Sequence, residues 1–138
     1  MKTELSEYYK RLKPFVLQMP FGTYFFFEKF IVSEINEGVH FEWNMAEKLA
    51  LEVFKYYGKD AKLGFISNRV NRHSVDPQNW IKLEKNHTII IASTIVAYDK
   101  LNFMNASIEK KFTKNSIKRC KSLNEAIKWI SNLEALKK

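Results

Sequence analysis

The feature that most constrains the fold is a nearly continuous run of apolar and β-branched residues from Thr88 to Val96. A run of this composition is typical of a β-strand whose two faces are both buried. Burial of both faces requires other elements to pack above and below the sheet, which is the arrangement of α/β proteins. The rest of the chain is therefore expected to supply neighbouring strands and the helices that cover them.

Strands and helices are expected to alternate along the chain. Apolar residues recur at helical spacing between Met45 and Tyr57 and predict an amphipathic helix there. Further strands are expected at 15–27, 30–35, 61–68 and 116–119, the first of them broken at Pro20 and Gly22. Further helices are expected at 76–83, at 101–112 and after Ser122. The helix at 101–112 is predicted from the apolar stripe of Leu101, Met104, Ile108 and Phe112. This order, β-β-α-β-α-β-α-β-α, predicts a single mixed, mostly parallel sheet with helices packed on it and an antiparallel edge at the start of the chain.

Two helices carry signals at their ends. Asn44 with Glu47, and Ser122 with Glu125, have the spacing of a capping box. In this motif the first side chain accepts a hydrogen bond from the helix backbone and the second reaches back to the preceding chain. Gly58 is expected to end the helix at 45–57 in a left-handed conformation, which glycine adopts without steric cost.

Length and composition favour one compact domain. The chain has 138 residues, 46% of them apolar, so we expect a single domain over residues 1–138, with residues 1–14 as a loose tail or helix. The single cysteine, Cys120, permits no internal disulfide and is expected to face the core. The charged N-terminus does not look like a signal peptide, and the longest apolar run, Ile89 to Ala97, is too short to span a bilayer. A cytoplasmic protein without a transmembrane segment is expected.

Two sequence stretches and the order of elements resemble a known family. The first stretch is Phe41-Glu42-Trp43-Asn44, which leads into the helix at 45–57. The second runs from Phe65 to Asn71 and continues with Ser74-Val75-Asp76-Pro77. From Phe21 to Leu133 the chain resembles an uncharacterised bacterial branch of the STAS or SpoIIAA-like domains, which are loosely similar to SEC14-like domains. The resemblance implies a STAS-like α/β fold and a non-enzymatic regulatory or adaptor role that resembles the anti-sigma factor antagonists, with a protein partner and no cofactor.

The resemblance also implies a site. In the antagonists, a serine between a strand and the next helix is phosphorylated by a partner kinase within an Asp-Ser-Ser/Thr-Gly motif. The matching serine here is Ser74, but Val75 follows it and no glycine does, while Asp76 and Pro77 are expected to start the helix instead. The loop that joins strand and helix is the expected surface for the partner, and its candidate residues are Asn68, Arg69, Asn71, Arg72, Ser74 and Asp76.

No catalytic or metal-binding motif stands out. His40, His73 and His87 are widely separated, and none has a second ligand at the spacing of a metal site. The four glycines are isolated, so neither a phosphate-binding loop nor a dinucleotide-binding fingerprint is present. The sequence therefore predicts no enzyme activity, no metal and no cofactor.

The net charge of +8 is concentrated in the last third of the chain. Residues 100–138 hold ten Lys or Arg and three Asp or Glu, a net charge of +7. The segment 110–121 has no acidic residue and is a candidate anion-binding site, with Lys110, Lys111, Lys114, Lys118, Arg119 and Lys121. The simpler interpretation is a solvated, lysine-rich surface, so nucleic acid is not the expected partner.

The aromatic residues from Tyr24 to Phe27, with Phe30 and Trp43, form another cluster of interest. Neighbours in a strand face opposite sides of a sheet, so some of these rings must face away from the others. Those rings then need a cover, which is a partner protein, a second copy of the chain or the N-terminal segment. Core packing is the leading interpretation, and the alternative is a pocket for a small apolar, lipid-like ligand.

Overall fold

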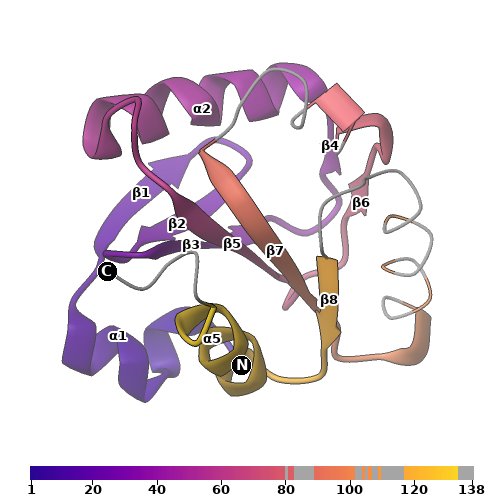
Figure 1. Cartoon of the computed structure of the whole chain (residues 1–138). Helices are drawn as coiled ribbons and strands as arrows, with labels where there is room; N and C mark the ends of the chain where they lie inside the picture. Colours follow the sequence, from indigo (N-terminus) through magenta and orange to yellow (C-terminus); the bar gives the residue numbers. More distant parts are fainter. Residues whose placement is uncertain are drawn as a thin grey trace.

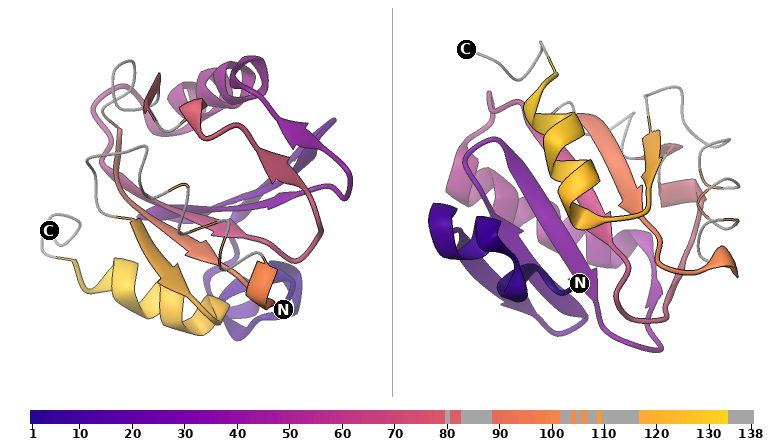
Figure 2. Two further views of the ribbon diagram at one scale, coloured as in Figure 1. Left: turned by 90° about the vertical axis from the view of Figure 1, so that its right-hand side faces the viewer. Right: turned by 90° about the horizontal axis from the view of Figure 1, so that it is seen from below.

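The structure of the chain, a computed structural model, has three layers (Figures 1 and 2). It describes residues 1–79, 81–82, 89–101, 104, 106, 109 and 117–133. A six-stranded sheet forms the middle layer. Helix α2 (Trp43–Tyr57) lies over one face, and helices α1 (Glu7–Leu12) and α5 (Leu123–Ser131) lie against the other. The predicted α/β class, with helices packed on one sheet, is confirmed.

The strands of the sheet stand in the order β1-β2-β3-β5-β7-β8. Their bounds are β1 (Phe15–Met19), β2 (Gly22–Phe26), β3 (Phe30–Ile35), β5 (Leu63–Asn68), β7 (Ile90–Val96) and β8 (Ile117–Cys120). The pairs β1–β2 and β2–β3 are antiparallel, whereas β3–β5, β5–β7 and β7–β8 are parallel. The sheet is therefore mixed and mostly parallel, with the predicted antiparallel edge at the start of the chain.

The antiparallel edge contains one strand more than expected. The segment 15–27 turns back at Pro20 and Phe21, so that β1 pairs with β2 and Met19 lies opposite Gly22. Glycine is required at position 22 because an added Cβ would lie 2.8 Å from the carbonyl oxygen of Glu34 in the next strand. The sequence predicts a break at these residues, but a bulge within one strand and a turn between two strands have the same sequence signals.

Helix α2 begins earlier than expected. Its N-cap is Glu42, which makes no side-chain capping hydrogen bond. Asn44 lies inside the first turn, so the predicted capping box of Asn44 and Glu47 is wrong. The half-buried Trp43 belongs to the first turn, and tertiary packing of this kind outweighs a local capping preference. Gly58 follows the last turn with φ 88° and ψ 170°, a positive φ that suits glycine but not the left-handed helical conformation that we expected.

Helix α5 starts as predicted. The Ser122 hydroxyl accepts a hydrogen bond from the backbone N–H of Glu125 at 3.1 Å, and the Glu125 carboxylate accepts one from the backbone N–H of Lys121 at 2.9 Å. The predicted apolar stripe is also confirmed. All of its members are buried, namely Leu123, Ala126, Ile127 and Ile130.

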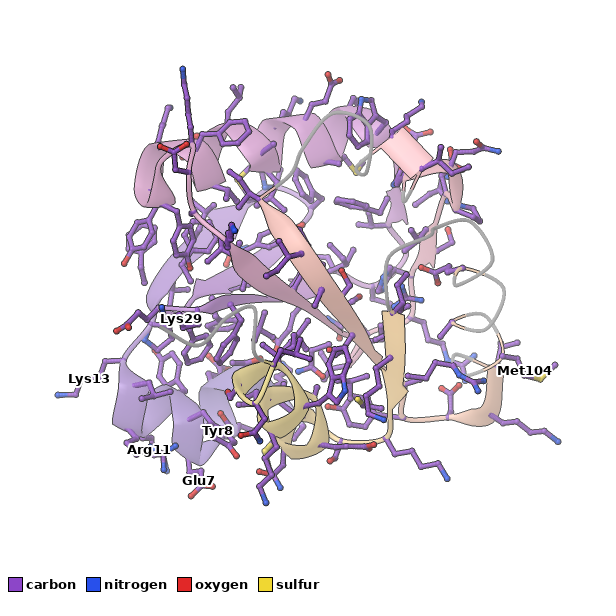
Figure 3. The ribbon with its side chains drawn as sticks, in the orientation of Figure 1. Glu7, Tyr8, Arg11, Lys13, Lys29 and Met104 are labelled. Carbon is purple, nitrogen blue, oxygen red and sulfur yellow. The ribbon has the colours of Figure 1, made fainter. Side chains whose placement is uncertain are left out.

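The N-terminal segment is an ordered cover for the sheet. A short 3₁₀ turn (Thr3–Leu5) precedes α1, and the Ser6 hydroxyl accepts a hydrogen bond from the N–H of Tyr9. Tyr9 packs edge-on against Phe25, with ring centroids 5.9 Å apart. Figure 3 shows Tyr8 on the side of α1 toward α5, where its hydroxyl contacts the side-chain oxygen of Asn124 at 2.5 Å. The N-terminal segment is thus one of the covers that the aromatic cluster requires.

The helix expected at 101–112 lies only partly within the described residues. Leu101 and Met104 are helical but 58% and 56% exposed, and Met104 projects from the molecule in Figure 3. Ala106 and Glu109 are helical and buried instead. The predicted stripe is therefore wrong at Leu101 and Met104, because the helix turns a charged residue, Glu109, inward to form an ion pair. The other two members of the stripe lie outside the described residues, namely Ile108 and Phe112.

A second, two-stranded sheet was not predicted. Strand β4 (His40–Phe41) pairs in parallel with β6 (Ser74–Val75), which lies inside the loop from Asn68 to Asp76. After this loop the Asp76 carboxylate accepts a hydrogen bond from the N–H of Gln78 at 3.0 Å, as expected of a helix cap. In the helix expected next, Trp80 and Leu83 fall outside the described residues. Within the described part of the chain, no helix has the length and apolar character needed to cross a membrane.

Candidate functional site

An apolar cavity lies between α2 and the sheet. Its volume is about 110 Å³. Side chains of β2, β3, β5 and β7 form its floor, and α2 forms its roof. The apolar lining consists of Tyr24, Ile31, Ile35, Phe41, Trp43, Ala46, Leu49, Ala50, Val53, Phe54, Phe65, Val75, Ile89 and Ile90.

The cavity exists because small residues face one another across it. Ala46 and Ala50 lie one turn apart on the α2 side, and Ser33 and Ser67 lie in β3 and β5 on the sheet side. Protein interiors are normally packed without voids of this size. Four short side chains at facing positions therefore leave open space that neighbouring aromatic rings do not fill.

One end of the cavity is polar. Ser67 and Arg69 stand at the carboxyl end of β5, and His73 and Asn79 follow in the chain. In α/β proteins the carboxyl ends of parallel strands are the usual place for a ligand. The polar end of this cavity lies at that edge of the sheet.

A buried ion pair lies beside the polar end. Arg69 and Glu109 are joined by two hydrogen bonds, of 2.5 Å and 2.7 Å, and both side chains are almost fully buried. A third guanidinium N–H, on Nε, donates to the Ser67 hydroxyl at 3.1 Å. The positive charge of Arg69 is thus matched by a carboxylate at the site, so the pair adds no net charge to the cavity.

His73 presents an acceptor without a partner. Its Nδ1 lies 3.1 Å from the backbone oxygen of Asn71, so Nδ1 carries the proton and donates. Burial, helped by the positive charge of Arg69, lowers the pKa of His73 and favours the neutral ring. In the neutral ring with Nδ1 protonated, Nε2 is an acceptor, and this buried atom has no hydrogen-bond partner among the described residues.

Asn79 and Tyr24 behave in the same way. The side-chain amide of Asn79 donates to the backbone oxygen of Phe41 at 3.0 Å, which leaves its oxygen buried and unpaired in the described structure. The Tyr24 hydroxyl is also buried and unpaired, and burial raises the pKa of Tyr24 so that the hydroxyl keeps its proton. A buried polar group without a partner costs about 1–3 kcal/mol.

The loop predicted to bind a partner is largely used inside the protein. Asn68 is buried and its amide donates to the Glu34 carboxylate, and Asn71 donates to the backbone oxygen of Ile35. Of the six predicted residues, Arg69 lines the cavity and Asp76 caps the next helix. Those that are exposed are Arg72 and Ser74.

Ser74 has a neighbour that the sequence does not indicate. Because β4 pairs with β6, His40 lies opposite Ser74, and its Nδ1 is 2.6 Å from the Ser74 hydroxyl oxygen. The two residues are far apart in the sequence, and no sequence motif contains both of them. Both side chains are exposed, so a modification at Ser74 would be accessible, and this site stays a prediction.

The basic segment is described only at its end. Lys118 and Arg119 lie in the edge strand β8, and Lys121 follows it; the Lys118 ammonium is 4.0 Å from the Glu125 carboxylate. Cys120 points into the core as predicted, and burial raises the pKa of its thiol to about 11. The residues of the segment that lie outside the described part of the chain are Lys110, Lys111 and Lys114, so anion binding here stays a prediction.

The aromatic cluster is divided between the two faces of the sheet. Tyr24 and Phe26 pack on the α2 side, and Phe25, Phe27 and Phe30 pack with α5 on the other. Most rings of the aromatic cluster pack in the core, as the leading interpretation predicts, while Tyr24 and Trp43 line the cavity. The polar end was not predicted, because no motif contains His73 or Asn79 and only the fold brings both to the cavity. Within the described residues, no group of three possible metal ligands is present.

Comparison with known proteins reveals a likeness of fold. No protein-family model matches the sequence, and no curated protein matches it. Among solved structures, the chain is similar to an uncharacterized protein of the DUF3478 family with a SpoIIAA-like fold from Shewanella loihica PV-4. The TM-score is 0.53 and the sequence identity 10%, over 85% of this chain and 91% of that chain. The protein therefore has a SpoIIAA-like fold, as the resemblance of its sequence implies.

Proposed function

We propose that the domain binds a small apolar molecule in the cavity between α2 and the sheet. The observation that supports this most directly is an apolar cavity whose polar end holds buried groups without hydrogen-bond partners. Mostly apolar walls with a few polar groups at one place are the usual character of a small-molecule site. This function is the ligand-carrier alternative to the regulatory role that the resemblance implies.

A binding site and a packing defect differ in the groups that surround the empty space. A purely apolar void costs stability in proportion to its volume and gains nothing from polar neighbours. Here three separate polar groups, on Tyr24, His73 and Asn79, line the same cavity and lack partners. A ligand that fills the space and supplies hydrogen bonds would remove both costs at once.

The regulatory role has its own support and its own surface. The SpoIIAA-like fold is compatible with an adaptor, but a fold alone does not imply a function. The loop residues available to a protein partner are Arg72 and Ser74, with His40 beside them. Affinity capture with wild type and with Arg72→Glu/Ser74→Asp tests this surface, and identical sets of retained proteins would count against it.

Native mass spectrometry tests the proposed function. Ala50→Trp should fill the cavity, whereas Leu51→Trp, the adjacent position on the same helix, lies at the surface with Leu51 61% exposed. We expect a co-purifying small molecule, or toluene added to the purified protein, to be retained by wild type and Leu51→Trp and lost from Ala50→Trp. If wild type binds neither, or if Ala50→Trp binds toluene as well as wild type does, the cavity is not the site.

A further inference from the structure

We propose that the ligand of the cavity carries a neutral head group that donates a hydrogen bond, as an alcohol or an amide N–H does, rather than a carboxylate or a phosphate. This inference rests on the proposed function and adds the chemical class of the ligand. It follows from the roles of the polar atoms at one end of the cavity and from the charge around them.

Two of the unpaired groups are acceptors. The ring of His73 uses Nδ1 to donate to the backbone of Asn71, and the amide of Asn79 uses its nitrogen to donate to the backbone of Phe41. Each donor is therefore already engaged within the protein. His73 Nε2 and Asn79 Oδ1 remain, and both need a donor from outside the side chains described.

The third group is compatible with the same ligand. The Tyr24 side chain is fully buried, with 0% exposure, and its hydroxyl has no partner in the described structure. A phenol can donate or accept a hydrogen bond. A ligand hydroxyl can both donate to an acceptor and accept from Tyr24, whereas a carboxylate could only accept.

Charge excludes an anionic head group from this end. Arg69 is the cation at the cavity, and Glu109 holds it through two hydrogen bonds. A carboxylate placed beside this pair would lose its hydration, and the positive charge of Arg69 next to it is already neutralised by Glu109. It would also lie near two acceptor atoms that repel it. Burial of an ion without a partner costs far more than burial of an alcohol.

The size of the cavity limits the ligand. A volume of about 110 Å³ suits a short alkyl chain or one or two rings. The apolar walls run from Ile89 and Ile90 to Trp43. The expected ligand is thus a compact apolar alcohol or amide.

A matched set of probes tests this inference by isothermal titration calorimetry. 1-Octanol and octanoate have the same chain and differ in head group, and toluene has no head group. At neutral pH we expect 1-octanol to bind at least about tenfold more tightly than octanoate, since one hydrogen bond and the cost of a buried charge both act in this direction. Octanoate that binds as tightly as 1-octanol would overturn the head-group inference and leave the proposed function standing. If no probe binds, toluene included, the proposed function itself is wrong.

Two variants assign the preference to named atoms. Tyr24→Phe removes only the hydroxyl and keeps the ring, so the fold should be retained. His73→Phe removes the acceptor Nε2, and His40→Phe is its control at an exposed position outside the cavity. We expect Tyr24→Phe and His73→Phe each to lower the affinity for 1-octanol several-fold while leaving that for toluene unchanged. Unchanged affinity for 1-octanol in both variants would overturn the assignment.

Discussion

The two faces of the sheet are closed in different ways. On the α5 face, Gly64 meets Ile130 so closely that an added Cβ would lie 2.7 Å from the Ile130 side chain. On the α2 face, Ala46 and Ala50 stand opposite Ser33 and Ser67, and a cavity remains between them. One face of the sheet is therefore tightly packed, whereas the other leaves a cavity.

The helices that cover the two faces also differ, both in their N-terminal caps and in how many of their side chains are buried. Helix α5 is capped by Ser122 and Glu125 and packs four apolar residues of its own into the core. Helix α2 lacks a side-chain cap at Glu42, and its buried residues are Leu49 and Val53, each 7% exposed. Helix α2 therefore buries fewer of its own side chains than α5 does.

The largest effect is expected at the ion pair beside the polar end of the cavity. Glu109→Gln leaves the buried Arg69 without its carboxylate, and a loss of this kind costs roughly 3–5 kcal/mol of unfolding free energy. Urea denaturation measures it. The control is Glu52→Gln, because the contact of Glu52 with Lys55 at 3.3 Å lies at the surface and is worth about 0.5 kcal/mol or less. Equal losses in the two variants would mean that water reaches Arg69.

The next largest effect on stability is expected when a larger side chain is introduced on one face of the sheet or on the other. Gly64→Ala should destabilise the protein by about 2 kcal/mol, because Ile130 must move to admit the methyl group. Ala50→Leu adds more atoms on the other face, yet we expect a change within about 0.5 kcal/mol, since the cavity accepts them. Thermal unfolding of both variants checks this. The contrast between the faces fails if Ala50→Leu proves the more damaging.

A smaller effect on stability is expected at the N-termini of α5 and α2, and it differs between the two helices. Ser122→Ala should cost about 1 kcal/mol, because the backbone N–H of Glu125 loses its acceptor. Asn44→Ala, inside the first turn of α2, should cost nothing and can stabilise the helix slightly through the higher helix propensity of alanine. Guanidinium denaturation can resolve the difference. A comparable loss in both variants would restore the capping role of Asn44.

The smallest effect is expected from acid, and it concerns the α2 face alone. The pKa of His73 is lowered in the folded protein, first by burial and then by the charge of Arg69. Below the unfolded value of about 6.5, the unfolded chain then binds more protons than the folded one, so stability falls as the pH drops toward the folded pKa. His73→Gln should flatten this part of the pH profile, and His40→Gln should not. A wild-type profile that is flat between about pH 5 and 7 would contradict the prediction.

Much of the fold was predictable because its signals are local. The bounds of β3 agree with the expected strand at 30–35, and the stripe and capping box of α5 were both confirmed. Where prediction failed, long-range contacts decided the outcome. Leu101 and Met104 are exposed because Glu109 turns inward to meet Arg69, and this pairing joins residues far apart in the chain.

The sequence by itself determined the α/β class, the mixed sheet and the burial of Cys120, because alternation, periodicity and capping act over a few residues. Only the tertiary structure decided the candidate site. The β4–β6 pair brings His40 to Ser74, and the chain crossings bring His73, Asn79 and Tyr24 around one cavity. None of these residues forms a sequence motif with another. A cavity also depends on the short side chains that leave space between packed elements, and this space depends on how the elements pack.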